Sequence, residues 1–243
     1  MRRILETRLD SVKSFPQSES VVPNFTRDVQ PPNLNSSTLK PAPPTQSTHL
    51  RDRVLATSRE LLASGGLAAL SMREVARRAG VTHQAPYHHF PDKESIVAEL
   101  VTEGFEELAR RMSAANDAAA QGGKPEVLRR AAQAYLGFAL EHAGVFRVMF
   151  RPEICDSNRF PRAQVAAQSA RAQCERLVRI VHDGRFSESL ASMHWAHVHG
   201  LACLVLDGPL GAQLTTEEAR RAHLLEASEH FIGLITGQQT GAD

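Results

Sequence analysis

Apolar residues recur at every third or fourth position from His49 to near the end of the chain, the spacing that places them on one face of an α-helix. Leu50, Val54, Leu61 and Leu62 begin this pattern. No stretch alternates apolar and polar residues as a half-buried strand does, and residues with high strand propensity gather nowhere. The sequence therefore predicts an all-α fold of about nine helices.

Glycines, prolines and polar clusters divide this pattern into separate helices. The first helix is expected to stop at the "SGG" of residues 64–66, and Asp92 is expected to cap a long helix that includes Met112. The other helices are expected at about 72–79, 83–89, 125–141, 143–150, 161–183, 187–206 and 216–236.

Residues 71–90 have the features of a helix-turn-helix. Ser71 and Glu74 predict a capping box, in which the serine oxygen accepts an N–H and the glutamate reaches back to the helix start. A turn at 80–82 leads to a short polar helix, in which Pro86 is expected at about the third position. The positions expected to pack inward are Val75, Ala76, Val81 and Phe90, with Ala79 and Gly80 small because the two helices cross closely.

The polar residues of the second helix are free to face outward. A glutamine can bond an adenine edge through two hydrogen bonds, and the other polar groups can donate to phosphates or read base edges. Lys93, at the start of the next helix, can reach a phosphate as a point charge. Between His49 and Ser95 there are seven Lys and Arg against five Asp and Glu, so the electrostatic attraction of one copy to DNA is modest. The outward residues are Thr82, His83, Gln84, Tyr87 and His88.

The segment "SMREVARRAGVTHQAPYHHFPDKESIVAEL" closely resembles the DNA-binding domain of the tetracycline-repressor (TetR) family of transcriptional regulators, and the resemblance covers residues 50–110. The matching positions are Ala79, Gly80, Val81, Thr82, Tyr87, His88, Phe90 and Lys93. The resemblance implies that Thr82, Tyr87 and Lys93 hold phosphates and that His83, Gln84 and His88 face the major groove. Family members commonly have Thr-Leu before the tyrosine, whereas this chain has Ala85-Pro86, which restricts Ala85 to contact with a thymine methyl. The predicted DNA-binding residues are Ser71, Arg73, Thr82, His83, Gln84, Ala85, Tyr87, His88 and Lys93.

The second half of the chain resembles one C-terminal subclass of the same family. The resemblance rests on the tryptophan–histidine–glycine (WHG) pattern of Trp195, His199 and Gly200 and on "EHAGVFRVMF" at 141–150. It implies a pocket for a small-molecule effector of unknown identity. A plain helical core is the alternative, and the residues alone do not separate the two. The predicted lining is Tyr135, Phe138, Phe146, Met149, Phe150, Trp195 and His199.

The last two helices carry more apolar residues than a single body needs to bury. These residues are Leu201, Leu204, Val205, Leu206, Leu224, Leu225, Phe231, Ile232, Leu234 and Ile235. Helices of this kind pair across a two-fold axis in similar proteins, so we expect a homodimer through the last two helices. Two recognition helices spaced by one turn of DNA, ~34–36 Å, would then read a palindrome.

Histidines in two places raise the alternative of a metal site. His83, His88 and His89 have no further ligand at a suitable spacing, and only two of the three histidines at 194, 197 and 199 share a helix face. We therefore expect neither a metal nor a cofactor. The chain has no GxSxG, HExxH, P-loop or Rossmann glycine pattern, so the sequence does not predict an enzyme.

Residues 14–48 differ in composition from the rest, because seven of the thirteen prolines lie before position 49 among Ser, Thr, Asn and Gln. Such a stretch buries too little apolar surface to offset its ordering entropy. The expected organisation is a disordered tail at 1–48, a DNA-binding domain at 49–95, a helical effector-binding and dimerisation domain at 96–237 and a second disordered tail at 238–243. An arm that touches DNA and a start codon placed too far upstream are the alternatives for the first tail.

These observations predict a sequence-specific DNA-binding transcriptional regulator, in particular a ligand-responsive repressor that binds a palindromic operator as a homodimer. No apolar run approaches the ~18 residues that span a bilayer, and three widely spaced cysteines favour a reducing cytoplasm. The alternative is a helical small-molecule or metal-binding protein in which the helix-turn-helix serves only packing.

Overall fold

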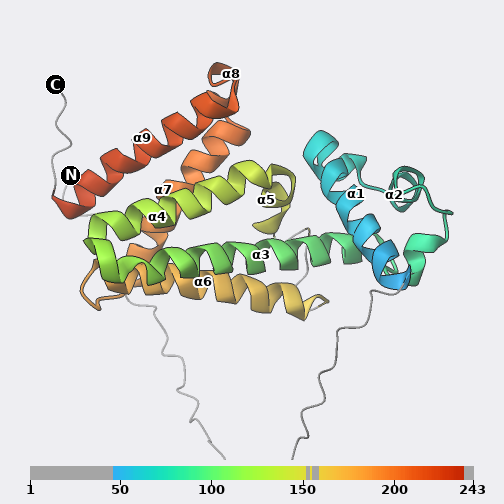
Figure 1. The fold of residues 1–243 in the computed structure, drawn as a ribbon, viewed down its shortest axis with the longest axis horizontal. Helices are drawn as coiled ribbons and strands as arrows, with labels where there is room; N and C mark the ends of the chain where they lie inside the picture. Colours follow the sequence, from blue (N-terminus) through green and yellow to red (C-terminus); the bar gives the residue numbers. More distant parts are fainter. Residues whose placement is uncertain (1–45, 152–153, 155–158, 238–243) are drawn as a thin grey trace, which may run out of the picture. The chain divides into compact units, whose positions relative to one another are not determined.

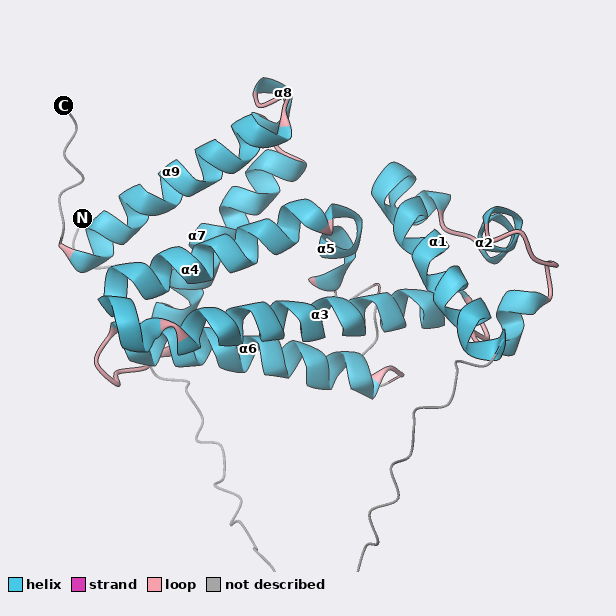
Figure 2. Cartoon of the chain, in the orientation of Figure 1, coloured by secondary structure: helices cyan, strands magenta, loops and turns pink. Residues whose placement is uncertain are grey.

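Nine α-helices and one short 3₁₀ helix form the part of the chain that the computed structural model describes, residues 46–151, 154 and 159–237 (Figure 1). No strand occurs among these residues (Figure 2), so the predicted all-α fold is confirmed. The predicted tails lie outside the described residues, except that 46–48 form the first turn of α1. The helices are α1 (Gln46–Ala69), α2 (Met72–Arg78), η1 (Ala85–His88), α3 (Lys93–Asp117), α4 (Ala119–Glu141), α5 (Ala143–Met149), α6 (Pro161–Val181), α7 (Glu188–Leu206), α8 (Leu210–Gln213) and α9 (Glu217–Thr236).

Glycines with positive φ break the helices where the sequence predicted interruptions. Gly66 has φ 63° and kinks α1, so that its main run stops at the predicted "SGG". Gly123 has φ 72° and kinks α4 two residues before Pro125, where the sequence predicted a helix to begin. The short helix α8 was not predicted.

Helix α3 is the central element of the fold. It packs along α6 and against α4, and it also contacts α1 and α5 (Figure 1). Its apolar stripe, which includes Ile96, Leu100, Phe105 and Leu108, is buried. The predicted cap is confirmed, because Asp92 Oδ1 accepts a hydrogen bond from the Ser95 N–H at 2.8 Å. Because one continuous helix contacts both α1 and α6, a displacement at one end can reach the other.

Helix α5 contacts α1 through a glycine. A Cβ atom placed on Gly144 would lie 2.6 Å from the backbone nitrogen of Ala63 and 2.6 Å from the carbonyl carbon of Leu62. Real Cβ atoms do not approach backbone atoms this closely, so the two helices can meet at this distance only because residue 144 has no side chain.

We expect Gly144→Ala to lower the free energy of unfolding by about 1–3 kcal/mol, because the added methyl group must push the backbones of α1 and α5 apart. The matched control is Gly137→Ala in α4, where a Cβ would meet only the flexible end of Glu141 at 3.7 Å. That control is expected to raise the free energy of unfolding by about 0.5–1 kcal/mol, as alanine does in place of glycine inside a helix. Denaturant unfolding of both variants measures the difference, and equal effects would contradict the close contact.

Candidate nucleic-acid interface and interior cavity

The first helix of the motif begins with half of the predicted capping box. Ser71 Oγ accepts a hydrogen bond from the Glu74 N–H at 3.2 Å. The expected return bond from Glu74 is wrong, because its carboxylate binds Arg77 and Arg78 in the same helix. Hydrogen bonds from these two guanidinium groups lower the pKa of Glu74 to about 2. The i, i+3 and i, i+4 ion pairs thus replace the second half of the box.

The turn between the two helices depends on the backbone of Gly80. Gly80 has φ 63°, and the next N–H, of Val81, bonds the Ala76 carbonyl at 3.0 Å. A Cβ on Gly80 would meet only the Arg53 guanidinium, at 3.7 Å. The expected reason for this glycine, a close helix crossing, is therefore wrong, and the left-handed conformation is the reason. Arg53 also donates to the Ala79 carbonyl and holds α1 against the turn.

The second helix of the motif is shorter than the predicted 83–89 segment. It is the single 3₁₀ turn η1, with Pro86 at its second position rather than its third. Proline has no N–H, so the bond that an α-helix would need from Pro86 to the Thr82 carbonyl cannot form. Instead the Ala85 N–H bonds the Thr82 carbonyl at 3.0 Å and the Tyr87 N–H bonds the Gln84 carbonyl at 3.1 Å, the spacing of a 3₁₀ helix.

Buried anchors leave the polar residues of this segment exposed. Pro86 and Phe90 are buried, whereas the five residues expected to face outward (82–84, 87 and 88) are all exposed. The Tyr87 side chain is 41% exposed and its ring lies 5.7 Å from that of His83. Gln84 precedes η1 and makes no side-chain capping bond, which leaves its amide available to a ligand.

The other predicted contacts surround this exposed segment. Ser71 and Arg73 at the start of α2 are exposed, and Ala85 and Lys93 are half-buried. His89, for which the sequence suggested no role, is also half-buried. The nine predicted residues therefore come from the start of α2, the segment around η1 and the first residue of α3, and their contact with DNA remains a prediction.

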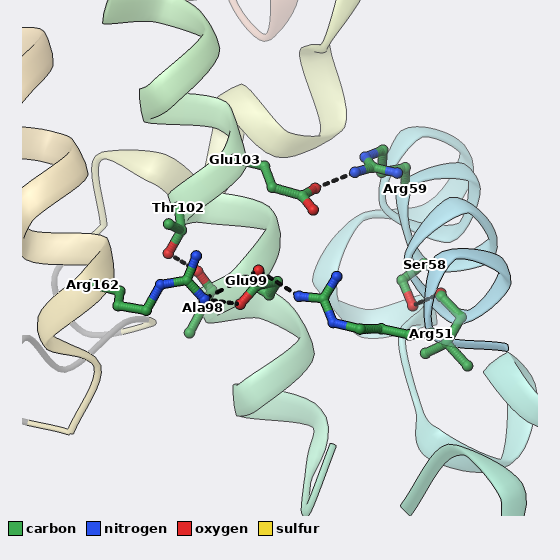
Figure 3. Close-up of polar contacts among 9 residues, drawn as sticks. Arg51, Ser58, Arg59, Ala98, Glu99, Thr102, Glu103 and Arg162 are labelled. Carbon is green, nitrogen blue, oxygen red and sulfur yellow. Dashed lines mark hydrogen bonds and ion pairs between the residues drawn. The ribbon is translucent and has the colours of Figure 1, made fainter. Parts of the chain in front are cut away.

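Ion pairs join α1 and α3, the helices on either side of the helix-turn-helix, to each other and to α6. Glu99 in α3 lies between two arginines (Figure 3): Arg51 Nη2 of α1 is 2.5 Å from Oε1, and Arg162 Nη1 of α6 is 3.2 Å from Oε2. The Glu99 side chain is only 17% exposed. A second ion pair, between Asp92 and Arg159, connects the cap of α3 to the residues before α6. The start of α6 is thus linked through α3 to α1.

A cavity of about 310 Å³ lies among α3, α4, α6, α7 and α9, and it is partly open to solvent, because its lining includes exposed residues such as Glu188 and Trp195. Three of the seven residues predicted to line it do so, namely Tyr135, Phe150 and Trp195. The other four, Phe138, Phe146, Met149 and His199, lie outside the lining. The side chains of Phe138, Phe146 and Met149 are at most 5% exposed and belong to the hydrophobic core.

Residues that the sequence analysis missed form much of the cavity wall. Helix α6 contributes Ala167, Ala170 and Cys174, and α9 contributes Phe231 and Ile232. Small residues at three- and four-residue spacing on one face of α6 leave space beside that helix, and this pattern was a signal that could have been used. The sequence analysis instead chose mainly aromatic residues as the predicted lining, and Phe138 and Phe146 among them pack in the core.

The polar groups around the cavity mostly satisfy one another. The Tyr135 hydroxyl lies 2.9 Å from His199 Nδ1 and accepts a hydrogen bond from Trp195 Nε1 at 3.1 Å. The Nε2 atoms of His182 and His194 lie 3.0 Å apart. Burial, with help from the neighbouring histidines, lowers the pKa of His194 to about 4, so this ring is neutral near pH 7.

The last two long helices use only part of their apolar surface inside the chain. Val205, Leu224 and Ile232 are buried in the core. Leu204 in α7 is 42% exposed and Leu234 in α9 is 83% exposed. The expected surplus on these helices is therefore smaller than the sequence suggested, and Leu204 and Leu234 are its most exposed members.

Comparison with known proteins gives two family models and many similar structures. Residues 54–100 match the model described as "Bacterial regulatory proteins, tetR family", and residues 128–227 match "Tetracyclin repressor-like, C-terminal domain". No helix of the described residues is long and apolar enough to cross a membrane.

Three solved structures illustrate the similarity in fold. A Rhodococcus protein of unknown function is 25% identical with a TM-score of 0.60, covering 77% of this chain and 94% of that one. The TetR family transcriptional regulator PfmR from Thermus thermophilus is 20% identical with a TM-score of 0.58, covering 78% and 100%. The fatty acid degradation regulator FadR from Bacillus halodurans is 13% identical with a TM-score of 0.58, covering 76% and 95%.

Proposed function

Because the chain belongs to the tetR family of bacterial regulatory proteins, and is thus a DNA-binding transcriptional regulator rather than an enzyme, we propose that it is a repressor controlled by a small molecule. In this proposal a homodimer binds a palindromic operator, and an effector in the cavity releases it. The observation that carries the proposal is the set of exposed residues 82–84, 87 and 88, held in place by the buried Pro86 and Phe90. The assignment to the WHG subclass and the proposed domain limits remain predictions.

Binding to DNA is tested with the duplex that lies upstream of the protein's own coding sequence. Fluorescence anisotropy should show tighter binding to this duplex than to a scrambled one of equal length and composition. The affinity should fall steeply as salt is raised from about 50 to 200 mM, because phosphate contacts release counterions. Equal binding to both duplexes would contradict sequence-specific regulation. It would favour the alternative in which the helix-turn-helix only packs against the rest of the protein.

Effector control requires a physical connection between the cavity and the DNA-binding segment, and α3 with its ion pairs is suited to this. Helix α6 contributes to the cavity wall, and its first turn is joined to Glu99 by Arg162. Glu99 in turn is joined to α1 by Arg51. A ligand that prefers one position of α6 would shift the population of dimers toward or away from the spacing that fits successive major grooves.

We expect Arg51 and Arg162 to be energetically coupled through Glu99 although they do not bond each other. Removing either arginine leaves Glu99 with one partner, whereas removing both leaves a mostly buried carboxylate with neither. The double variant Arg51→Gln/Arg162→Gln should therefore be less stable than the sum of the single variants by about 0.5–1 kcal/mol in denaturant unfolding. The coupling should vanish in a Glu99→Gln background.

The matched control for this cycle is Arg59, which pairs with Glu103 one turn further along α3 (Figure 3). The effects of Arg59→Gln and Arg162→Gln should add to within about 0.3–0.5 kcal/mol, since they have no shared partner. If the effects of Arg51→Gln and Arg162→Gln on the free energy of unfolding also added, the proposed connection through Glu99 would be contradicted.

A further inference from the structure

The cavity opens to solvent between α6 and α7. Among the described residues of its lining, the exposed ones are Arg171, Glu188, Ser192 and Trp195, and all four belong to these two helices. The lining residues that α3 and α4 contribute are buried. A ligand can therefore place one part of its structure inside the protein while another part stays at the opening, in contact with water.

The interior of the cavity suits an apolar group of about two rings. An apolar cavity of about 150 Å³ in another protein accepts one benzene ring. The cavity here is about twice that size, at about 310 Å³. Its wall includes Phe105, Leu108 and Met112 from α3 and Val198 from α7. A ligand that fills it therefore gains most of its binding free energy from apolar contact.

The buried part of the described lining carries no charge. Burial lowers the pKa of both His194 and His197, so these two rings are neutral near pH 7. Burial also raises the pKa of the Tyr135 hydroxyl, which therefore stays protonated. Any preference of the cavity for a charged ligand must then come from the residues at its opening.

Three charged residues at the opening form one cluster with a net charge of −1. Arg171 is 3.2 Å from a Glu175 oxygen and 2.6 Å from a Glu188 oxygen. No other described residue of the lining has a charged side chain near pH 7. Each carboxylate bonds the guanidinium through one oxygen, so its second oxygen can accept a hydrogen bond from a ligand. The cluster therefore attracts a cation and repels an anion.

An aromatic ring lies on the same side of the opening as one of these carboxylates. Glu188, Ser192 and Trp195 share one face of α7, because they are spaced by four and then three residues. Seven residues of helix span about 10 Å. The Trp195 N–H donates to the Tyr135 hydroxyl at 3.1 Å, and the side chain remains 45% exposed. The face of a tryptophan ring attracts cations, so this side of the opening favours a positive group along its length.

From these observations we propose that the effector is an amphipathic cation, with an apolar part that fills the cavity and a protonated amine at the opening beside Glu175 and Glu188. The proposal rests on the proposed function of the cavity as the effector site. Because the opening is in contact with water, the amine keeps part of its hydration, and its electrostatic attraction to the exposed cluster is modest.

Three probes with the same biphenyl body test the charge of the ligand. Isothermal titration calorimetry would measure 4-phenylbenzylammonium, 4-phenylbenzyl alcohol and 4-biphenylacetate against the full-length protein. The ammonium is expected to bind about three- to tenfold more tightly than the carboxylate, with the alcohol between them, since exposed charge pairs contribute little each. The ratio should fall toward one as salt is raised from about 50 to 500 mM, because salt screens exposed charges. Tighter binding of the alcohol or the carboxylate than of the ammonium, or binding of none of the three, would overturn the proposal.

Reversing the charge of the cluster tests the residues. Glu175→Gln with Glu188→Gln changes its net charge from −1 to +1, so the carboxylate should then bind more tightly than the ammonium. Arg171→Gln changes the net charge to −2 and should strengthen the preference for the ammonium about two- to fivefold. The control Glu106→Gln with Glu226→Gln removes the same charge at exposed positions of α3 and α9 outside the lining, and should leave the ratio unchanged. An unchanged ratio in the Glu175 and Glu188 variant, or an equal change in the control, would contradict the assignment.

Operator binding without any probe separates this inference from the proposed function. A protein that binds its operator but prefers the carboxylate probe would overturn the inference alone. A protein that prefers the ammonium through Glu175 and Glu188 but shows no preference for its operator would overturn the proposed function alone.

Discussion

Leu234→Lys is expected to dissociate the proposed homodimer while leaving each chain folded. The Leu234 side chain is 83% exposed on α9, so a folded single chain loses little when it is replaced. If α7 and α9 form the two-fold interface, each dimer buries two copies of this leucine, at about 1.5–3 kcal/mol each. Two lysines would remove this contribution and repel each other, which raises the dimer Kd at least about 100-fold.

Sedimentation velocity over a range of concentrations measures the dimer Kd directly. The matched control is Val165→Lys, which places the same charge on another exposed apolar residue, 65% exposed, in α6. The control should remain a dimer. If both changes dissociated the dimer, or if neither did, the proposal that α7 and α9 form the interface would be contradicted.

Loss of the dimer should also weaken operator binding, because one copy has little electrostatic attraction for DNA. Residues 49–95 contain seven Lys and Arg and five Asp and Glu. Three of these charges, Glu74, Arg77 and Arg78, are joined in one ion-paired cluster. A single copy therefore depends on few phosphate contacts, and the second copy supplies a second set of the same contacts.

The sequence predicted the helices well because helix formation follows local signals. The periodic apolar residues and the caps Ser71 and Asp92 act within one or two turns, and the structure has helices at these places. The short segment around Pro86 was predicted less well, since a 3₁₀ turn differs from a short α-helix only in which carbonyl each N–H reaches. That difference depends on which hydrogen bonds can form and does not appear in the apolar pattern.

The cavity could be predicted only in part because its wall depends on tertiary packing. Tyr135 and Phe138 lie less than one turn apart in α4, yet only Tyr135 lines the cavity. Both are buried, and which of them faces the cavity depends on the rotation of α4 about its axis relative to α3, α7 and α9. The small residues of α6 become part of the cavity wall only when the helices are brought together.

Gln84→Ala is expected to reduce sequence specificity, whereas Tyr87→Phe is expected to reduce affinity for every sequence. Gln84 is exposed and makes no capping bond, so its amide is free to bond an adenine in the major groove. Losing this contact should cost about 1–3 kcal/mol of discrimination per half-site, or about 2–6 kcal/mol over a palindrome. Tyr87→Phe keeps the ring beside His83 and removes only the hydroxyl, so binding to every sequence should weaken by a similar factor.

Anisotropy titrations against the operator and a set of duplexes with one symmetric substitution each distinguish these outcomes. For Gln84→Ala, the preference should disappear at one base pair in each half-site and persist at the others. For Tyr87→Phe, the order of the duplexes should be unchanged while all affinities fall. If Gln84→Ala instead weakened every duplex equally, Gln84 would bind a phosphate, and sequence reading would then depend on His83 and His88, the other exposed residues expected to face the groove.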